Sequence, residues 1–236
     1  MRRKALFFVV LAAIVSLCGP AHAIVGEAGP ADVAIQRHTV LLFSGKGRCS
    51  GVVLAPQLVL TAAHCVEAAE GKYYVTGLVR EAVRVDVAEV VRHPDFRKTD
   101  ADIALVKLIK PLPERFLPAF FQGRPLQAGD PVIIGGYGIA IAGKSDARTT
   151  LRSAALVVSH LWRGRATVTD ANTGDRNRLG PCHGDSGGPA FTYRGMLTLV
   201  GIMSSGDCKG TASIVTVSHY YGWILETASK LGSPLN

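Results

Sequence analysis

The chain has 236 residues and a formal net charge of +8 at pH 7. This length is enough to bury a large core, either as one all-β domain or as two small barrels. The Lys and Arg residues are scattered, without the clustered stripe or the interleaved aromatic residues of a nucleic-acid groove. The composition therefore disfavours a protein that binds nucleic acid. A cationic protein that acts on membranes or polyanions would need its Lys and Arg residues to cluster on one surface. The sequence shows no such cluster, so only the fold could create one.

Residues 1–23 combine a basic start, a nearly unbroken apolar run and small residues at the end, which is the pattern of a signal peptide. We predict cleavage at about Ala23 and secretion of residues 24–236 to the periplasm or the extracellular space. A membrane anchor is disfavoured, because the apolar run at residues 5–17 is shorter than the roughly 20 apolar residues that span a bilayer. Another alternative is a lipoprotein signal at Cys18, although Leu17 is a poor residue before a lipidated cysteine.

Removal of the signal peptide leaves 213 residues and a net charge of +5, because three cations and no acids leave with it. No further long apolar run follows, so we expect a protein without stable membrane insertion, and we expect a monomer. An even number of cysteines in an exported chain predicts two disulfides, but spacing alone does not rank the three possible pairings. The four cysteines are Cys49, Cys65, Cys182 and Cys208.

Between residues 39 and 217 the chain is a series of short β-branched or apolar runs, separated by turns rich in Gly, Pro and Asp. This spacing predicts an all-β fold, an antiparallel sandwich or barrel rather than alternating βαβ units. Predicted strands include residues 39–43, 52–54, 58–61, 83–91, 103–108, 132–134, 151–158 and 197–203.

Three other segments organise the chain. The proline-rich stretch near residues 110–130 has little periodic pattern and predicts the connection between two halves. The polar stretch 167–178 predicts an exposed loop. Apolar residues recur at helical intervals over residues 220–231, which predicts one amphipathic helix at the end of the chain.

The most informative segment is Cys-His-Gly-Asp-Ser-Gly-Gly-Pro at residues 182–189. Its glycines permit backbone conformations that aim several N–H groups at one point beside a single hydroxyl, that of Ser186. Acyl transfer needs this arrangement: a nucleophile, and donors for the oxygen that becomes negative in the transition state. The tetrapeptide Gly-Asp-Ser-Gly alone is also common as an ordinary turn, so its context decides.

A serine hydroxyl is a weak nucleophile at neutral pH and needs a base. Among the seven histidines the candidate is His64, which in Thr-Ala-Ala-His-Cys directly follows a predicted strand. Asp102, which begins the apolar run Asp-Ile-Ala-Leu, supplies a carboxylate that can orient the base. Singly these could be a core histidine and a turn residue, but with Ser186 they predict a catalytic triad. The other histidines lack metal-ligand spacing, so we expect no metal and no cofactor.

The motifs at residues 61–65, 102–105 and 184–189, in this order, resemble the three signatures of the chymotrypsin/trypsin family. The resemblance extends from Ile24 to the terminal helix. It implies two six-stranded antiparallel β-barrels, a short C-terminal helix, and catalytic groups in the cleft between the barrels.

The resemblance also implies roles for further residues. The N–H groups of Gly184 and Ser186 would form the oxyanion hole. Family members are activated when cleavage frees an N-terminal Ile-Val-Gly, whose ammonium pairs with the Asp beside the nucleophile, so Ile24 would pair with Asp185. Because Ile24 directly follows the predicted signal peptide, we hypothesise that signal peptidase makes the activating cut. The implied disulfides are Cys49–Cys65 and Cys182–Cys208.

By the same resemblance, the primary specificity pocket has its floor at Gly180. No acid stands at Gly180, so a buried Arg or Lys side chain of a substrate would lack a partner. We therefore predict cleavage after apolar or small residues rather than after Arg or Lys. The chain departs from the family at Ser205, where Trp is usual, and at Pro181, and Asp207 lies nearby. The expected walls of the pocket include Ser204, Gly206 and Ala212.

Together these residues predict a secreted serine endopeptidase that acts on protein or peptide substrates, with ester cleavage as a side activity. The alternative is a catalytically silent relative that acts as a binding protein. Such a relative is recognised by a replaced triad residue or oxyanion glycine, and none is replaced here.

Overall fold

The structure is a computed structural model that describes residues 24, 28–44, 47–67, 73–77, 81–122, 124–139, 150–171 and 178–235. The predicted signal peptide, residues 1–23, lies outside this part of the chain. None of the helices in the described ranges combines the length and the apolar character needed to cross a bilayer.

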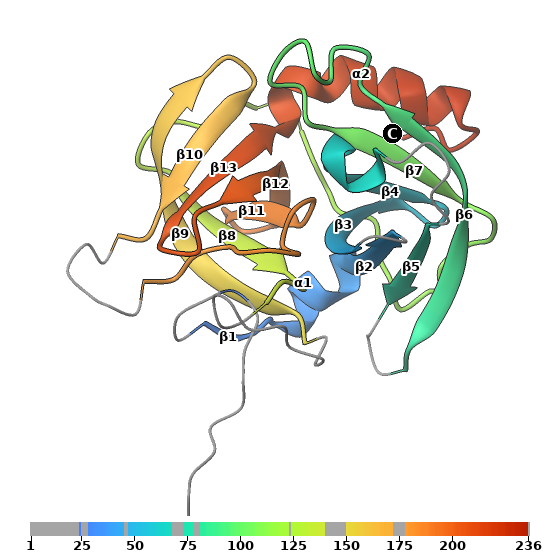
Figure 1. Ribbon diagram of the computed structural model, residues 1–236, viewed down its shortest axis with the longest axis horizontal. Helices are drawn as coiled ribbons and strands as arrows, with labels where there is room; N and C mark the ends of the chain where they lie inside the picture. The colour runs from blue at the N-terminus through green and yellow to red at the C-terminus, as the bar shows by residue number, and fades with distance from the viewer. Residues whose placement is uncertain are drawn as a thin grey trace, which may run out of the picture.

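Six antiparallel strands of the N-terminal half form a closed barrel in the order β2-β3-β4-β7-β6-β5 (Figure 1). Strand β7 is almost entirely buried, because one of its faces points into this barrel and the other packs toward the second barrel. The strands are β2 (Thr39–Ser44), β3 (Gly47–Ala55), β4 (Leu58–Thr61), β5 (Tyr74–Gly77), β6 (Val83–Arg92) and β7 (Ala104–Leu108).

The C-terminal half forms a second barrel, which closes because β8 pairs with both β9 and β11. The two closed six-stranded barrels confirm the predicted fold class. The short strand β1 (Gly29–Pro30) pairs with the first two residues of β9, Arg152 and Ser153. The barrel strands are β8 (Pro131–Gly136), β9 (Arg152–Trp162), β10 (Arg165–Thr169), β11 (Pro189–Tyr193), β12 (Leu197–Gly206) and β13 (Thr211–Thr216).

Three apolar clusters follow from the alternation of side chains along the strands. In β2, Val40 and Leu42 point into the first barrel, whereas Leu41 joins a cluster that contains side chains of both barrels. That shared cluster also holds Phe191 of the second barrel and Ile224 of the terminal helix. The third cluster fills the second barrel. The shared cluster therefore joins the two barrels.

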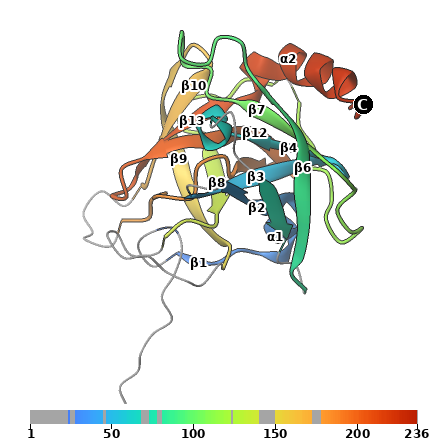
Figure 2. The same cartoon turned by 45° about the vertical axis from the view of Figure 1, so that its right-hand side comes forward.

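The predicted terminal helix is α2 (Val217–Lys230), which begins directly after β13. Figures 1 and 2 show that α2 leaves the second barrel and reaches over β7 of the first, and Lys107 of β7 donates to the hydroxyl of Ser233 just beyond the helix at 2.7 Å. The short helix α1 (Val33–His38) was not predicted, and Asp32 caps it by accepting from the N–H of Ala34.

The predicted loop at residues 167–178 is wrong at its start. Residues 167–169 continue β10, because they pair in register with β13, for example Thr167 with Ser213. The threonines that made this stretch look polar are β-branched and suit a strand. Residues 172–177 lie outside the described part of the chain.

Candidate active site

Two neighbouring strands of the first barrel carry the predicted base and its carboxylate. His64 lies in the short helix η1 (Ala63–Val66), which follows β4, and Asp102 precedes β7, the antiparallel partner of β4. Because β4 and β7 are antiparallel, the end of β4 and the start of β7 lie side by side at one end of the barrel. Asp102 Oδ2 is 2.8 Å from His64 Nδ1, and Asp102 Oδ1 accepts the backbone N–H of His64 at 2.9 Å. Since a carboxylate only accepts, Nδ1 carries the proton and Nε2 is left as the base.

The second barrel contributes a further donor to Asp102. The hydroxyl of Ser204 donates to Asp102 Oδ2 at 2.6 Å, and both side chains are buried. Burial by itself would raise the pKa of Asp102, but the hydrogen bonds from His64 and Ser204 and the charge of His64 lower it below its ordinary value. Asp102 is therefore held as a carboxylate, which keeps the imidazole in one tautomer and stabilises its cation.

The predicted nucleophile belongs to the second barrel, where it lies in the turn before β11. The hydroxyl of Ser186 donates to the backbone carbonyl of Ser204 at 3.4 Å. Among the described residues no hydrogen bond joins this hydroxyl to His64 Nε2. The side chain of His64 is 38% exposed. Catalytic hydrogen bonds are often long or unformed without substrate, so the missing bond does not argue against Ser186 as the nucleophile.

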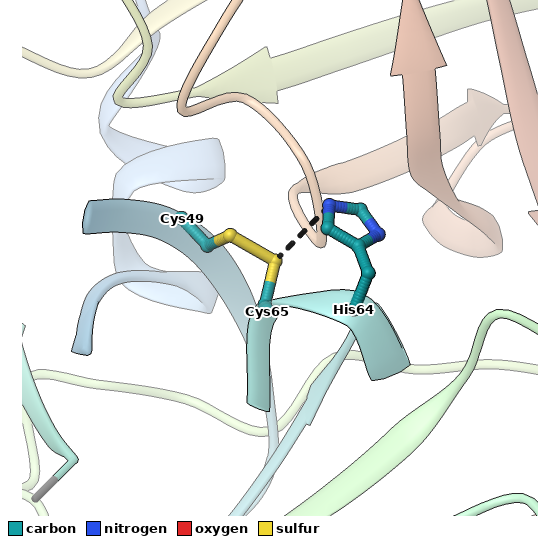
Figure 3. Close-up of side chains that lie close together, drawn as sticks. All are labelled: Cys49, His64 and Cys65. Atoms are coloured by element: carbon teal, nitrogen blue, oxygen red, sulfur yellow. Dashed lines mark hydrogen bonds between the residues drawn. A yellow bond between two sulfur atoms is a disulfide. The ribbon is translucent and has the colours of Figure 1, made fainter. Parts of the chain in front are cut away.

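A disulfide lies directly beside the base. Figure 3 shows the Cys49–Cys65 disulfide beside the ring of His64. Cys65 Sγ is 3.7 Å from His64 Nε2. These three residues place possible metal-binding atoms together, but the sulfurs are bonded to each other and offer no thiolate to a metal. The second disulfide, Cys182–Cys208, ties the turn before the nucleophile to the loop after β12. These are the two pairings that the family resemblance implies.

The backbone around Ser186 requires glycine. Gly184 has φ +97°, and a Cβ there would lie 3.0 Å from Gly138 Cα. Gly187 has φ +79°, and a Cβ there would overlap Thr61 Oγ1. In the described part of the chain, the N–H groups of Gly184 and Ser186 have no backbone or side-chain acceptor. Both are free donors, as the predicted oxyanion hole requires.

Asp185, next to the nucleophile, is completely buried. Its two carboxylate oxygens accept the N–H groups of Gly138 at 2.7 Å and Cys182 at 2.8 Å. Burial raises its pKa to about 7, although these two bonds and the charge of Arg48 act in the opposite direction. Ile24 is also buried, but in the uncleaved chain its nitrogen is an amide rather than an ammonium. The predicted ion pair between Ile24 and Asp185 therefore belongs to a cleaved form.

Comparison with known proteins agrees with this geometry. The sequence profile described as "Trypsin" matches residues 24–224. The chain belongs to the trypsin family. Its His64–Asp102 pair fits the catalytic triad of trypsin-like serine proteases.

Individual relatives are distant. The chain is 30% identical to serine protease SP24D of Anopheles gambiae, over 82% of this chain and 77% of that protein. It is 28% identical to vitamin K-dependent protein C of Oryctolagus cuniculus, over 78% of this chain, and spans about half the length of that relative. A solved structure of neuropsin, a serine protease expressed in the limbic system of mouse brain, matches 85% of this chain and 98% of its own, with a TM-score of 0.69 and 24% identity. That likeness shows the fold.

The predicted specificity residues of this trypsin-family chain do not all line one hollow. An open cavity of about 320 Å³ between β10, β12 and β13 contains Gly206 and Ala212. Gly180 instead packs against the backbone of Gly210, and a Cβ on Gly180 would lie 2.6 Å from the Gly210 nitrogen. The hydroxyl of Ser204 donates to Asp102. The cavity is lined mostly by small and hydroxyl side chains: Thr167, Ser205, Gly206, Asp207, Thr211, Ala212 and Ser213.

Sequence reasoning missed two residues that contact the catalytic machinery, Ser50 and Arg165. Arg165 Nη1 donates to the hydroxyls of Ser204 and Ser213 at 3.1 and 3.0 Å, and its Nε donates to the carbonyl of Asp100 at 3.0 Å. This side chain therefore links the segment before Asp102 to two strands of the second barrel. Nothing in the local pattern of a single arginine in a β-strand indicates such partners.

Proposed function

We propose that the protein is a secreted serine endopeptidase that hydrolyses peptide bonds through an acyl-enzyme on Ser186. The observation that carries this proposal is the 2.8 Å contact between His64 and a buried, ionised Asp102. Ser204 binds this carboxylate through its hydroxyl and the hydroxyl of Ser186 through its carbonyl, so the three predicted triad residues lie in one neighbourhood. The two disulfides are consistent with an exported protein.

The reaction begins when His64 Nε2 takes the proton of the Ser186 hydroxyl as Oγ attacks the carbonyl carbon of the scissile bond. The carbonyl oxygen becomes negative and is stabilised by the N–H groups of Gly184 and Ser186. His64 then gives the proton to the leaving amine, the C–N bond breaks, and the acyl group stays on Ser186. Water, deprotonated by His64, attacks this ester, and the proton returns to Ser186 as the acid leaves. Asp102 stays ionised throughout and stabilises the imidazolium.

The proposed preference is for an apolar or small residue before the cleaved bond. It rests on the absence of an acid at Gly180 and on the small, hydroxyl-bearing lining of the cavity that holds Gly206 and Ala212. A substrate Arg or Lys side chain would meet no acid at Gly180, and Asp207 in the cavity lining already accepts the N–H groups of Lys209 and Thr211 with its Oδ1. Cleavage of a peptide library mainly after Arg or Lys would contradict this proposal.

The proposed activation is a cut before Ile24 by signal peptidase. The new ammonium would pair with Asp185, whose buried carboxylate has a raised pKa while it lacks such a partner. Such a pair would hold the Gly184 N–H in place, and removing one partner of a buried ion pair typically costs about 3–5 kcal/mol. N-terminal sequencing that finds Ala23 retained, or a lipid on Cys18, in fully active protein would refute this step.

A catalytically silent binding protein is the second candidate. One observation favours it, because the Ser186 hydroxyl donates to the carbonyl of Ser204 instead of to His64. The intact triad residues and free oxyanion donors favour the enzyme.

The test is labelling with a fluorophosphonate probe, which reacts with an activated serine. Protein that begins at Ile24 is compared with its Ser186→Ala variant, and the modified residue is located by mass spectrometry. Labelling confined to Ser186 supports the endopeptidase. Absence of labelling in folded wild-type protein supports the silent relative.

A further inference from the structure

A buried serine of the first barrel contacts the turn that carries the nucleophile. Ser50 lies in β3, directly after Cys49, and is completely buried. Its hydroxyl donates to the carbonyl of Gly184 at 3.0 Å and accepts the N–H of Tyr137 at 2.9 Å. Its backbone N–H donates to the carbonyl of Ser186 at 2.8 Å. One residue of the first barrel thus holds two carbonyls of the catalytic turn, which belongs to the second.

The directions of these bonds are unambiguous. A carbonyl oxygen only accepts and a backbone N–H only donates, so the Ser50 hydroxyl must give its proton to Gly184 and receive one from Tyr137. The single proton of the hydroxyl is therefore committed to Gly184. No apolar residue could satisfy both neighbours.

The oxyanion donors belong to peptide units whose orientations are fixed through their carbonyls. N–H and C=O lie in one plane and point in opposite directions, so binding the carbonyl aims the N–H. The unit that carries the Gly184 N–H has its carbonyl, at His183, bound by the N–H of Ile139 at 2.9 Å. The unit that carries the Ser186 N–H has its carbonyl at Asp185. This carbonyl accepts the N–H of Gly188 at 2.9 Å.

The peptide unit between these two joins Gly184 to Asp185, and its carbonyl is the one bound by the Ser50 hydroxyl. Gly184 has no side chain that would restrict rotation of this middle unit. Such a rotation would change the angle between the two outer N–H donors. The φ of +97° at Gly184 lies in a region where glycine moves freely. The Ser50 hydroxyl is therefore placed to restrict the rotation that would separate the two donors.

We infer that Ser50 is a positioning residue for the oxyanion hole: it holds the central peptide unit so that the N–H groups of Gly184 and Ser186 point at one oxygen. This inference rests on the proposed function. It assigns a contribution to the rate of acyl transfer to a residue outside the three catalytic motifs. The effect is on the transition state, because the substrate oxygen becomes negative only there.

The experiment compares wild type, Ser50→Ala and a matched control, Thr39→Val, each beginning at Ile24. Thr39 is also completely buried, and its hydroxyl donates to a backbone carbonyl, that of Ile35, at 2.8 Å, away from the catalytic turn. The substrate is p-nitrophenyl acetate, with the acylation rate constant and the half-saturating ester concentration measured separately. Circular dichroism reports folding.

We expect the Ala variant to acylate about 10- to 100-fold more slowly at an unchanged half-saturating concentration, because misplaced donors cost rate rather than binding. The Thr39→Val control should lose thermal stability without losing rate. Ser50→Thr, which keeps the hydroxyl, should restore the rate to within about threefold of wild type. If the Ala variant does not fold, Ser50→Gly removes the same hydroxyl and takes its place.

Two outcomes would overturn the inference in distinguishable ways. If wild type reacts and the Ala variant, or Ser50→Gly in its place, acylates as fast as the Thr39→Val control, Ser50 serves stability alone and the proposed function stands. If wild type reacts with neither p-nitrophenyl acetate nor the fluorophosphonate, the proposed function falls and the role of Ser50 falls with it.

Discussion

Asp185 should make the stability of the uncleaved chain decrease as the pH rises. The carboxylate is completely buried, and the two bonds it receives from the described residues come from neutral backbone N–H groups. Burial raises its pKa from 3.8 to about 7. At 1.36 kcal/mol for each pKa unit, ionisation therefore costs about 4 kcal/mol more in the folded chain than in the unfolded chain.

The sign follows from proton binding in the two states. Below about pH 4 the carboxyl is protonated in both states and no cost arises. Between pH 4 and 7 the folded chain still holds a proton that the unfolded chain has lost, so the free energy of unfolding decreases as the pH rises. Above pH 7 the cost of about 4 kcal/mol is complete. Asp185→Asn removes this charge, but its NH₂ faces one of the two N–H donors at every pH, which costs about 1–3 kcal/mol.

The assay is urea unfolding followed by circular dichroism at pH 4 to 8, on protein that keeps Ala23 and carries Ser186→Ala to prevent self-digestion. The added Asp185→Asn change should destabilise this form at pH 4, and the difference should move by about 4 kcal/mol in favour of Asn by pH 8. In protein that begins at Ile24, the ammonium should reverse the sign, with Asn less stable at pH 8 by about 3–5 kcal/mol. A pH-independent difference in the uncleaved form would refute the reasoning, because it would mean that Asp185 already has a cation partner there.

Three further perturbations test the contacts around the triad. Ser204→Ala removes the 2.6 Å bond to Asp102 and should lower the free energy of unfolding at pH 7 by about 2 kcal/mol. Because the pKa of Asp102 is lowered in the folded state, this loss should shrink as the pH falls through that pKa. A pH-independent loss in urea titrations would contradict the assignment. Arg165→Met keeps the aliphatic stem but removes the bonds to three segments, so differential scanning calorimetry should find a loss of about 2 kcal/mol, or a Tm lower by about 4–8 °C, and an unchanged Tm would show that these bonds contribute nothing net. Replacing Cys182 and Cys208 together by Ser opens a link of 26 residues and should cost about 3 kcal/mol in urea unfolding, whereas equal midpoints for the variant and wild type would contradict a stabilising role.

Much of the site was predictable because its candidate catalytic residues lie in short sequence motifs. Ser186, His64 and Asp102 each stand in a local context that catalysis restricts, and the structure places His64 and Asp102 in contact. The all-β class and the terminal helix were also predictable, since alternating apolar runs and helical spacing are local patterns. The two six-stranded barrels came from the family resemblance. The pairing of the cysteines came from the family resemblance, because spacing alone leaves three possibilities.

Short elements with weak local signals were missed. The helix α1 has only six residues and depends on the cap from Asp32 and on burial of Ile35. Residues 167–169 were predicted as a loop, but pairing with β13, more than forty residues later in the chain, makes them a strand. Propensity is a weak guide where a distant partner supplies the hydrogen bonds.

The sequence by itself predicted the reacting groups, the export signal and the all-β class, because each prediction depends on residues close together in the chain. Only the tertiary structure decided what surrounds those groups. The Ser50 hydroxyl reaches a carbonyl 134 residues away, and the Ser204 hydroxyl reaches Asp102 across 102 residues. Single hydroxyl groups in β-strands carry no mark of such partners, since a hydrogen bond depends on a few tenths of an ångström and on direction, and the packing of the two barrels sets both.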